Sequence, residues 1–139
     1  MKGQYEDRTR FLLPRRTYTI IRLDGKAFHT YTRGLQKPFD DGLSGDIDAA
    51  IIAMLPEIQG AVFAYTQSDE VSILLTDFSL PATSAWFDGN LQKMTSVAAS
   101  LITAEFNRHR LIRDCGIESG DKYRETPMAY FDSRVFNHS

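Results

Sequence analysis

The order in which strand-like and helix-like segments follow one another constrains the fold of this chain more than any other feature. Four segments are rich in β-branched and aromatic residues and are bounded by turn residues, a pattern typical of strands. Two other segments repeat apolar residues every three to four positions, which indicates amphipathic helices. The expected strands are residues 17–23, 61–66, 71–75 and 129–136, the expected helices are 44–55 and 86–110, and a short mixed-charge helix is expected over 3–11.

This β-α-β-β-α-β order predicts a ferredoxin-like α+β fold, in which two helices pack on one face of an antiparallel sheet. The chain has 139 residues, of which 42% are hydrophobic, enough for one core. No repeat, low-complexity stretch or linker-like segment interrupts it. We therefore expect a single domain over residues 1–139.

Charge and cysteine content exclude several classes of protein. The chain has 16 basic and 18 acidic residues, a formal net charge of −2, so bulk positive charge does not hold it to nucleic acid. The single cysteine, Cys115, excludes an internal disulfide framework. The longest apolar run, residues 49–55, is too short to cross a bilayer, and the first residues lack a signal-peptide core. We expect a cytoplasmic protein without a membrane partner.

Two carboxylates are expected to meet at one edge of the sheet. The strands at 17–23 and 61–66 run in the same direction in this fold, so their C-terminal ends share an edge. Asp24 follows the first strand, and Asp69 lies in the turn after the second. Carboxylates and a carbonyl such as that of Gly25 are the hard ligands that Mg²⁺ prefers, and paired ions suit phosphoryl transfer. The alternative is that Asp-Gly and Ser-Asp-Glu are ordinary turn sequences.

The residues after Asp24 contain groups that could bind a nucleotide. Main-chain N–H groups near Lys26 could hold phosphates, Phe28 could pack under a base, and His29 could reach a phosphate. Lys37 and Lys93 are further candidate phosphate ligands. The alternatives are a core position for Phe28 and solvated surface positions for the others.

Other common catalytic patterns are missing from the sequence. It has no Gly-rich phosphate loop ending in Lys-Ser/Thr and no dinucleotide-binding fingerprint. It has neither closely spaced zinc ligands nor a hydrolase nucleophile elbow.

Five sequence motifs follow one another in an order that is more specific than any one of them. They are Arg22-Leu23-Asp24-Gly25-Lys26-Ala27-Phe28-His29, Lys37-Pro38-Phe39-Asp40, Tyr65-Thr66-Gln67-Ser68-Asp69-Glu70-Val71-Ser72, Trp86-Phe87-Asp88-Gly89-Asn90-Leu91-Gln92-Lys93 with the serine-alanine stretch 96–100, and Phe131-Asp132-Ser133-Arg134-Val135-Phe136. In this order and spacing, over roughly residues 11–137, the chain resembles the tRNA-His guanylyltransferase family.

The resemblance implies a domain like the palm of nucleic-acid polymerases, used to add nucleotides in the 3′–5′ direction. It implies that Asp24, the Gly25 carbonyl and Asp69 ligate two Mg²⁺ ions, and that Glu70 is a catalytic residue beside them. The implied nucleotide site consists of Asp24, Gly25, Lys26, Ala27, Phe28, His29, Lys37, Ser68, Asp69, Asn90 and Lys93.

The implied reaction transfers a nucleotide to the 5′ end of a tRNA. That end is activated as an adenylate or carries a triphosphate, and the 3′-hydroxyl of GTP attacks its phosphorus. The implied substrates are GTP, ATP and tRNA, and the implied assembly is a dimer or tetramer. Family members continue beyond the last palm strand, so we expect that their C-terminal portion is absent here.

One motif departs from the eukaryotic pattern. Eukaryotic enzymes of the family carry paired arginines after Trp-Phe, where this chain has Asp88-Gly89-Asn90. This resembles the bacterial, archaeal and phage branch, which implies templated repair of tRNA 5′ ends. Two alternatives stay open: a palm-type nucleotide cyclase, and a non-catalytic RNA-binding module. The second requires exposed sheet aromatics among Tyr18, Phe63, Tyr65 and Phe131.

Overall fold

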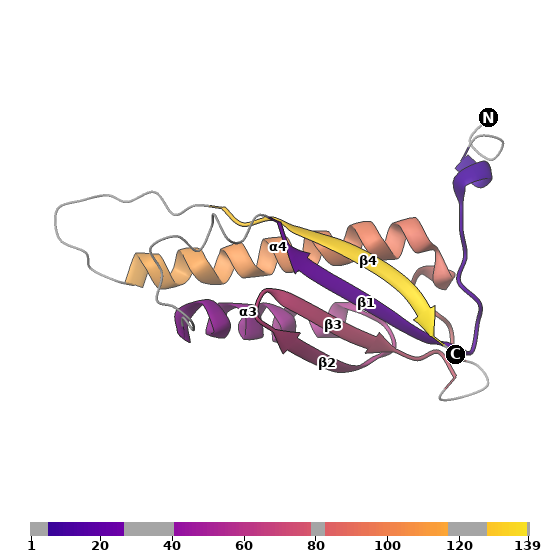
Figure 1. The fold of residues 1–139 in the computed structure, drawn as a ribbon, viewed down its shortest axis with the longest axis horizontal. Helices are drawn as coiled ribbons and strands as arrows, with labels where there is room; N and C mark the ends of the chain where they lie inside the picture. The colour runs from indigo at the N-terminus through magenta and orange to yellow at the C-terminus, as the bar shows by residue number, and fades with distance from the viewer. Residues whose placement is uncertain (1–5, 27–40, 79–82, 117–127, 139) are drawn as a thin grey trace.

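The computed structural model describes residues 6–26, 41–78, 83–116 and 128–138. They form a four-stranded sheet in the order β2-β3-β1-β4, in which every neighbouring pair is antiparallel (Figure 1). The strands are β1 (Tyr18–Gly25), β2 (Ala61–Gln67), β3 (Glu70–Leu75) and β4 (Phe131–His138). The α-helices are α3 (Asp41–Met54) and α4 (Leu91–Gly116), and short 3₁₀ helices are η1 (Asp7–Thr9), η2 (Leu55–Glu57) and η3 (Trp86–Gly89).

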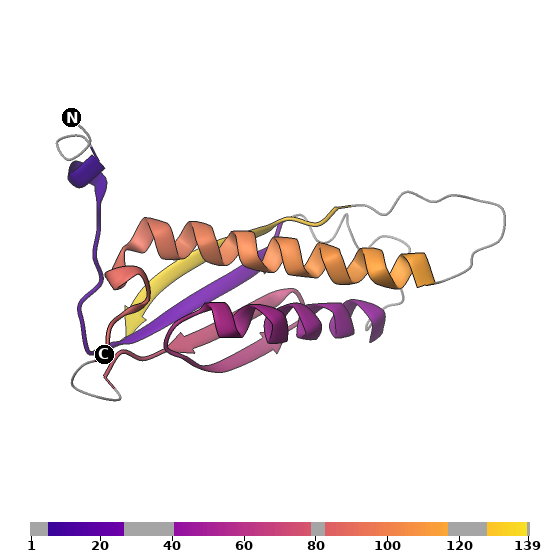
Figure 2. The same cartoon turned by 180° about the vertical axis from the view of Figure 1, so that it is seen from behind.

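Both α-helices cover the same face of the sheet, as Figure 2 shows from behind. Alternate strand residues point into the layer between sheet and helices, where Ile21, Leu23 and Ile73 are fully buried. The helices contribute the buried residues Ile47, Ala50, Ile51, Met54, Met94, Ala98, Ile102 and Phe106. This arrangement confirms the predicted ferredoxin-like α+β fold. None of the described helices is long and apolar enough to cross a membrane.

Several element boundaries differ from the sequence prediction, among them those of β1, of the N-terminal helix and of the start of α4. β1 continues through Asp24 and Gly25, because β3 and β4 pair with it on both sides up to that point. The expected helix over 3–11 is reduced, within the described residues, to the single turn of η1. α4 begins at Leu91 rather than at residue 86, because Phe87 and Asp88 adopt left-handed backbone angles, with φ of 49° and 54°. These angles are uncommon for residues with a Cβ and interrupt a right-handed helix.

A buried ion pair joins the two α-helices. Nη1 of Arg110 on α4 lies 3.0 Å from Oδ2 of Asp46 on α3, and the two side chains are 10% and 3% exposed. Charges so far from water are tolerated only when they are paired and hydrogen-bonded. The pair therefore contributes to how α3 and α4 align over the sheet.

Breaking this pair is expected to destabilise the fold strongly. Arg110→Met leaves the Asp46 carboxylate without its partner on the other helix, at a cost of about 3–5 kcal/mol in the free energy of unfolding. The double variant Arg110→Met/Asp46→Leu should recover most of that loss. The control Arg10→Ala removes an exposed pair with Asp7 and should cost about 0.5 kcal/mol or less. Urea unfolding measures all three, and an equal effect of Arg110→Met and Arg10→Ala would contradict the prediction.

Candidate functional site

The sheet face turned away from the helices is organised in three rows that run across the strands. The pairing register aligns one residue from each of β2, β3, β1 and β4 in every row. In that strand order, the aromatic row is Phe63, Leu74, Ile20 and Phe136, the arginine row is Tyr65, Ser72, Arg22 and Arg134, and the carboxylate row is Gln67, Glu70, Asp24 and Asp132. Successive rows are two residues apart, about 6.6–6.8 Å. Apolar, basic and acidic groups are thus separated along the strands.

Asp24 and Asp69 meet at the end of the sheet where the carboxylate row lies. Asp24 stands opposite Glu70 on one side and Asp132 on the other. Asp69 lies in the two-residue turn between β2 and β3, and its main-chain carbonyl accepts a hydrogen bond of 3.2 Å from the Gly25 N–H. This bond ties the turn to the end of β1. The predicted meeting of the two carboxylates at one edge is therefore present in the structure.

Electrostatics at this edge leave Asp69 with excess negative charge around it. Burial raises the pKa of the Asp69 carboxyl above its ordinary value, and the charges of Asp24 and Glu70 raise it further. Hydrogen bonds from its own main chain and from the Ser68 side chain oppose this rise. Arg22 offsets part of the charge, because its Nε lies 3.4 Å from Oε1 of Glu70.

The donor set at this edge fits a divalent cation with a preference for oxygen. Asp24 and Asp69 supply carboxylates, and the main chain at Gly25 adds a carbonyl. Burial and the neighbouring charges of Asp24 and Glu70 raise the pKa of Asp69, and a bound cation would oppose both effects. Within the described ranges, no three His, Cys, Asp or Glu side chains are placed to hold an ion by themselves. Further ligands would come from carbonyls, substrate phosphates and water, as is usual for Mg²⁺.

Comparison with known proteins identifies the family of the chain. The model of the tRNA(His) guanylyltransferase family matches residues 1–139. The chain belongs to the tRNA(His) guanylyltransferase family. It is 40% identical to a bacterial Thg1-like protein of known structure, with a TM-score of 0.88. That match covers 99% of this chain and 61% of the bacterial protein. The Schizosaccharomyces pombe tRNA(His) guanylyltransferase is 35% identical over 105 residues, and the probable Drosophila melanogaster enzyme 30% over 123 residues. These matches cover 74% and 85% of this chain, which spans 38% of either relative.

Of the other residues expected in the nucleotide site, Ser68 and Lys26 lie near the carboxylate row. Ser68 is next to Asp69 in the turn and has a positive φ of 58°, rare for a residue with a side chain. Lys26 is exposed just past β1, and its main-chain N–H donates a 2.8 Å hydrogen bond to the Tyr130 carbonyl. Four predicted residues, Ala27, Phe28, His29 and Lys37, lie outside the described residues.

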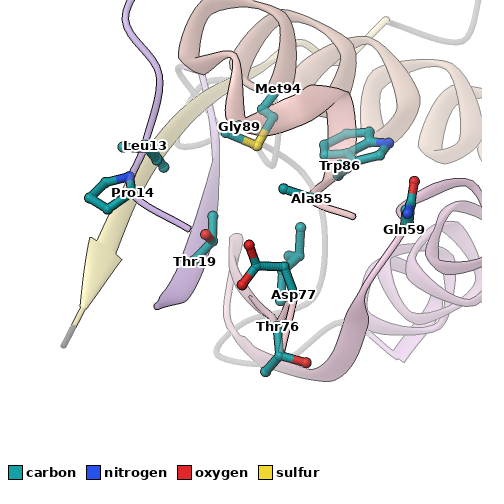
Figure 3. Close-up of a pocket in the computed structure, with 11 residues that line it drawn as sticks. Leu13, Pro14, Thr19, Gln59, Thr76, Asp77, Ala85, Trp86, Gly89 and Met94 are labelled. Carbon is teal, nitrogen blue, oxygen red and sulfur yellow. The ribbon is translucent and has the colours of Figure 1, made fainter. Parts of the chain in front are cut away.

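Asn90 and Lys93 lie at the opposite edge of the sheet, and the structure does not bring them to the carboxylates. The pocket in Figure 3 is formed where β1 begins and α4 begins, and Thr19, Gly89 and Met94 line it. Thr19 is five residues before Asp24, about 17 Å along an extended strand. The first turn of α4 is therefore far from Asp24 in this chain, which corrects the expectation that Asn90 and Lys93 share one nucleotide site with Asp24.

The contacts of Asn90 and Lys93 show that both residues stabilise the start of α4. Oδ1 of Asn90 accepts a 3.1 Å hydrogen bond from the Lys93 main-chain N–H, so Asn90 is the N-cap of α4. Nζ of Lys93 lies 5.1 Å from the centre of the Phe87 ring, a cation–π contact. The family resemblance predicted both residues in the nucleotide site, but the direction of α4 places them at the end of the sheet away from Asp24.

The sequence analysis did not single out Asp132 as a site residue. It lies directly opposite Asp24 on β4 and completes the carboxylate row. The signal that would have found it is the register between the first and last strands. Aligning Arg22 with Arg134 places Asp24 beside Asp132, but sequence alone does not give that alignment.

Replacing Asp69 by Asn is expected to stabilise the folded protein when metal is absent. The raised pKa means that the folded state binds the Asp69 proton more tightly than the unfolded state. This contribution to stability is therefore lost as pH rises from about 4 through the raised folded pKa. In EDTA near pH 8, Asp69→Asn should melt at a higher temperature than the wild type, and the difference should shrink on acidification. An Asp48→Asn control at an exposed position should show no such gain, and a lower melting temperature for Asp69→Asn would contradict the prediction.

The capping role of Asn90 gives a separate prediction. Asn90→Ala should lower the free energy of unfolding by about 1 kcal/mol, because the N–H of Lys93 loses its acceptor. Asn90→Asp or Asn90→Ser restores a capping oxygen and should restore most of the stability. Thermal unfolding measures the difference, while Mg²⁺-dependent GTP binding should stay unchanged in all three variants. A selective loss of GTP binding without loss of stability would show that Asn90 is a nucleotide ligand.

Proposed function

We propose that this chain is the catalytic palm part of a Mg²⁺-dependent nucleotidyltransferase that extends tRNA 5′ ends in the 3′–5′ direction. The observation that supports the proposal is the meeting of Asp24 and Asp69 at one edge, tied through Gly25. Related structures of a bacterial Thg1-like protein are known in complex with GTP and with ATP, which supports these nucleotides as substrates. The activity is guanylylation of histidine tRNA or templated repair of tRNA 5′ ends.

The proposed reaction is a phosphoryl transfer. It forms a bond between the 3′-hydroxyl oxygen of GTP and the 5′ phosphorus of the RNA. The bond that breaks joins that phosphorus to AMP or pyrophosphate, and the hydroxyl proton passes to solvent. Asp24, Asp69 and the Gly25 carbonyl would hold two Mg²⁺ ions. Such ions, when bound, favour the attacking alkoxide and neutralise charge on the leaving oxygen.

The chain's own residues contribute positioning and charge. Asp24 is fixed because β1 is paired on both sides, and Asp69 is fixed by the Gly25 hydrogen bond and by Ser68. Glu70 is held by Arg22 beside them. Lys26 is exposed at the end of β1, where its ammonium group can approach substrate phosphates. Fixed charges of this kind need no rearrangement during the reaction, which is why they lower its barrier.

The family resemblance also supports a cytoplasmic protein that assembles as a dimer or tetramer. tRNA and nucleoside triphosphates are the partners that the proposed reaction requires.

Loss of either central carboxylate should abolish the reaction. Asp24→Asn and Asp69→Asn each keep the shape of the side chain but remove the charge that would hold Mg²⁺. Incorporation of labelled GTP into 5′-triphosphorylated tRNA should fall at least about a hundredfold, the size of effect expected for one charge-stabilising group. Mg²⁺-dependent binding of a fluorescent GTP analogue should weaken in the same variants.

Asp48→Asn is the matched control, because Asp48 is exposed on α3, on the helical side of the sheet. It should retain both incorporation and GTP binding. Wild-type behaviour of both Asp24→Asn and Asp69→Asn would exclude the proposal. A cyclic product formed from GTP or ATP without RNA would favour a palm-type cyclase. RNA binding without any Mg²⁺-dependent nucleotide binding would favour a non-catalytic module.

A further inference from the structure

The open sheet face behind the carboxylate row combines exposed aromatic rings with paired arginines. Phe63 and Tyr65 on β2 are 60% and 56% exposed, and Phe136 on β4 is 36% exposed. Their neighbours along the strands, such as Ala64, pack against the core on the opposite face. Neither α3 nor α4 covers this open face (Figures 1 and 2). Phe131, by contrast, is buried against Phe106 and is not part of it.

The two arginines indicate the chemistry of an occupant. Arg22 and Arg134 stand directly opposite each other on β1 and β4, and like charges in that position destabilise a sheet. Arg22 is partly compensated by Glu70 at 3.4 Å. Arg134 is exposed and has no ion-pair partner within the described ranges. An anion bound between the two guanidinium groups would remove the repulsion, and phosphate matches the forked donors of arginine.

The aromatic row supplies flat surfaces beside that anion position. The guanidinium carbon of Arg22 lies 5.5 Å from the centre of the Phe136 ring, a cation–π contact that helps to orient the ring. Phe63 and Phe136 occupy the two outer strands of one row, three strand spacings or about 14 Å apart. Tyr65 lies on the arginine row beside Phe63. Exposed rings on a sheet next to positive charge are the elements with which proteins bind unpaired nucleotides.

We propose that this open face binds a single-stranded end of an RNA that leads to the carboxylate row. Arg134 and Arg22 contact a phosphate, while Phe63, Tyr65 and Phe136 stack on unpaired bases. The proposal deepens the proposed function, on which it rests, by naming the surface that holds the polynucleotide. Continuity supports it, because the arginine row is the next row behind Asp24. A protein partner fits less well, because two like-charged arginines would be buried at the middle of the interface.

The test is binding of a labelled single-stranded RNA to the full chain, with and without Mg²⁺, at several salt concentrations. Phe63→Ala and Tyr65→Leu should each raise Kd at least about fivefold, because one stacking surface is lost. Tyr65→Phe keeps the ring and should bind like the wild type. Arg134→Ala should weaken binding and reduce the slope of log K against log salt by about 0.7. Ile52→Ala and Arg108→Ala, at exposed helix positions, are the matched controls and should leave Kd unchanged.

Failure of this proposal can be distinguished from failure of the proposed function. Asp24→Asn should lose nucleotide addition but still bind RNA, whereas Phe63→Ala should weaken RNA binding with unchanged GTP binding. If Phe63→Ala, Tyr65→Leu and Arg134→Ala are folded and bind RNA with unchanged Kd, the proposed RNA-binding face is wrong, and the catalytic proposal is unaffected. Full displacement of the RNA by GTP alone would overturn it in favour of a mononucleotide site. A change from dimer to monomer in Phe63→Ala, with unchanged RNA binding, would show that the face joins two copies of the chain.

Discussion

The position of β1 between β3 and β4 decides where every group of the candidate site lies. Because β1 is paired on both sides, its register with β3 puts Asp24 beside Glu70, and its register with β4 puts Asp24 beside Asp132. The same pairing carries β1 beyond Asp24, so that this carboxylate stands on the sheet rather than in a free loop. A shift of one residue in either register would turn Asp24 toward the helices and bring Ile21 and Leu23 to the open face. The buried residues that stabilise the fold thus also position the carboxylates.

The carboxylate edge is a place where stability and function conflict. The fold brings Asp24, Asp69 and Glu70 together although the burial of Asp69 and the charges of its two neighbours raise the pKa of Asp69. The turn adds a non-glycine residue, Ser68, at positive φ. Unfavourable features of this kind are typical of sites that bind a cation or a substrate. The hydrophobic core offsets them elsewhere in the molecule.

Local patterns in the sequence were sufficient for the element order and for the meeting of Asp24 with Asp69. β-branched runs, helical periodicity and a polar hairpin turn each predict the structure of a short segment. The topology of the fold then places the ends of the first two strands at the same edge. Features that depend on contacts between segments far apart in the sequence could not be predicted from it. Asp132 joins the site only through the register of β4 with β1. Asn90 and Lys93 are excluded from it only by the direction of α4, and the left-handed turn at Phe87 and Asp88 has no periodic signal.

A formal net charge of −2 describes this protein poorly, because the open face separates its charges by row. The sum cancels Arg22 and Arg134 against Asp24, Glu70 and Asp132, yet these groups lie in different rows of the sheet. At distances within the Debye length of about 10 Å, an approaching RNA senses the local row rather than the total. The acidic row would repel phosphates in the absence of cations and attract them once divalent ions are bound there. RNA binding to the arginine row is therefore expected to strengthen when Mg²⁺ is added, although the arginines and the aromatic rings still bind RNA without it.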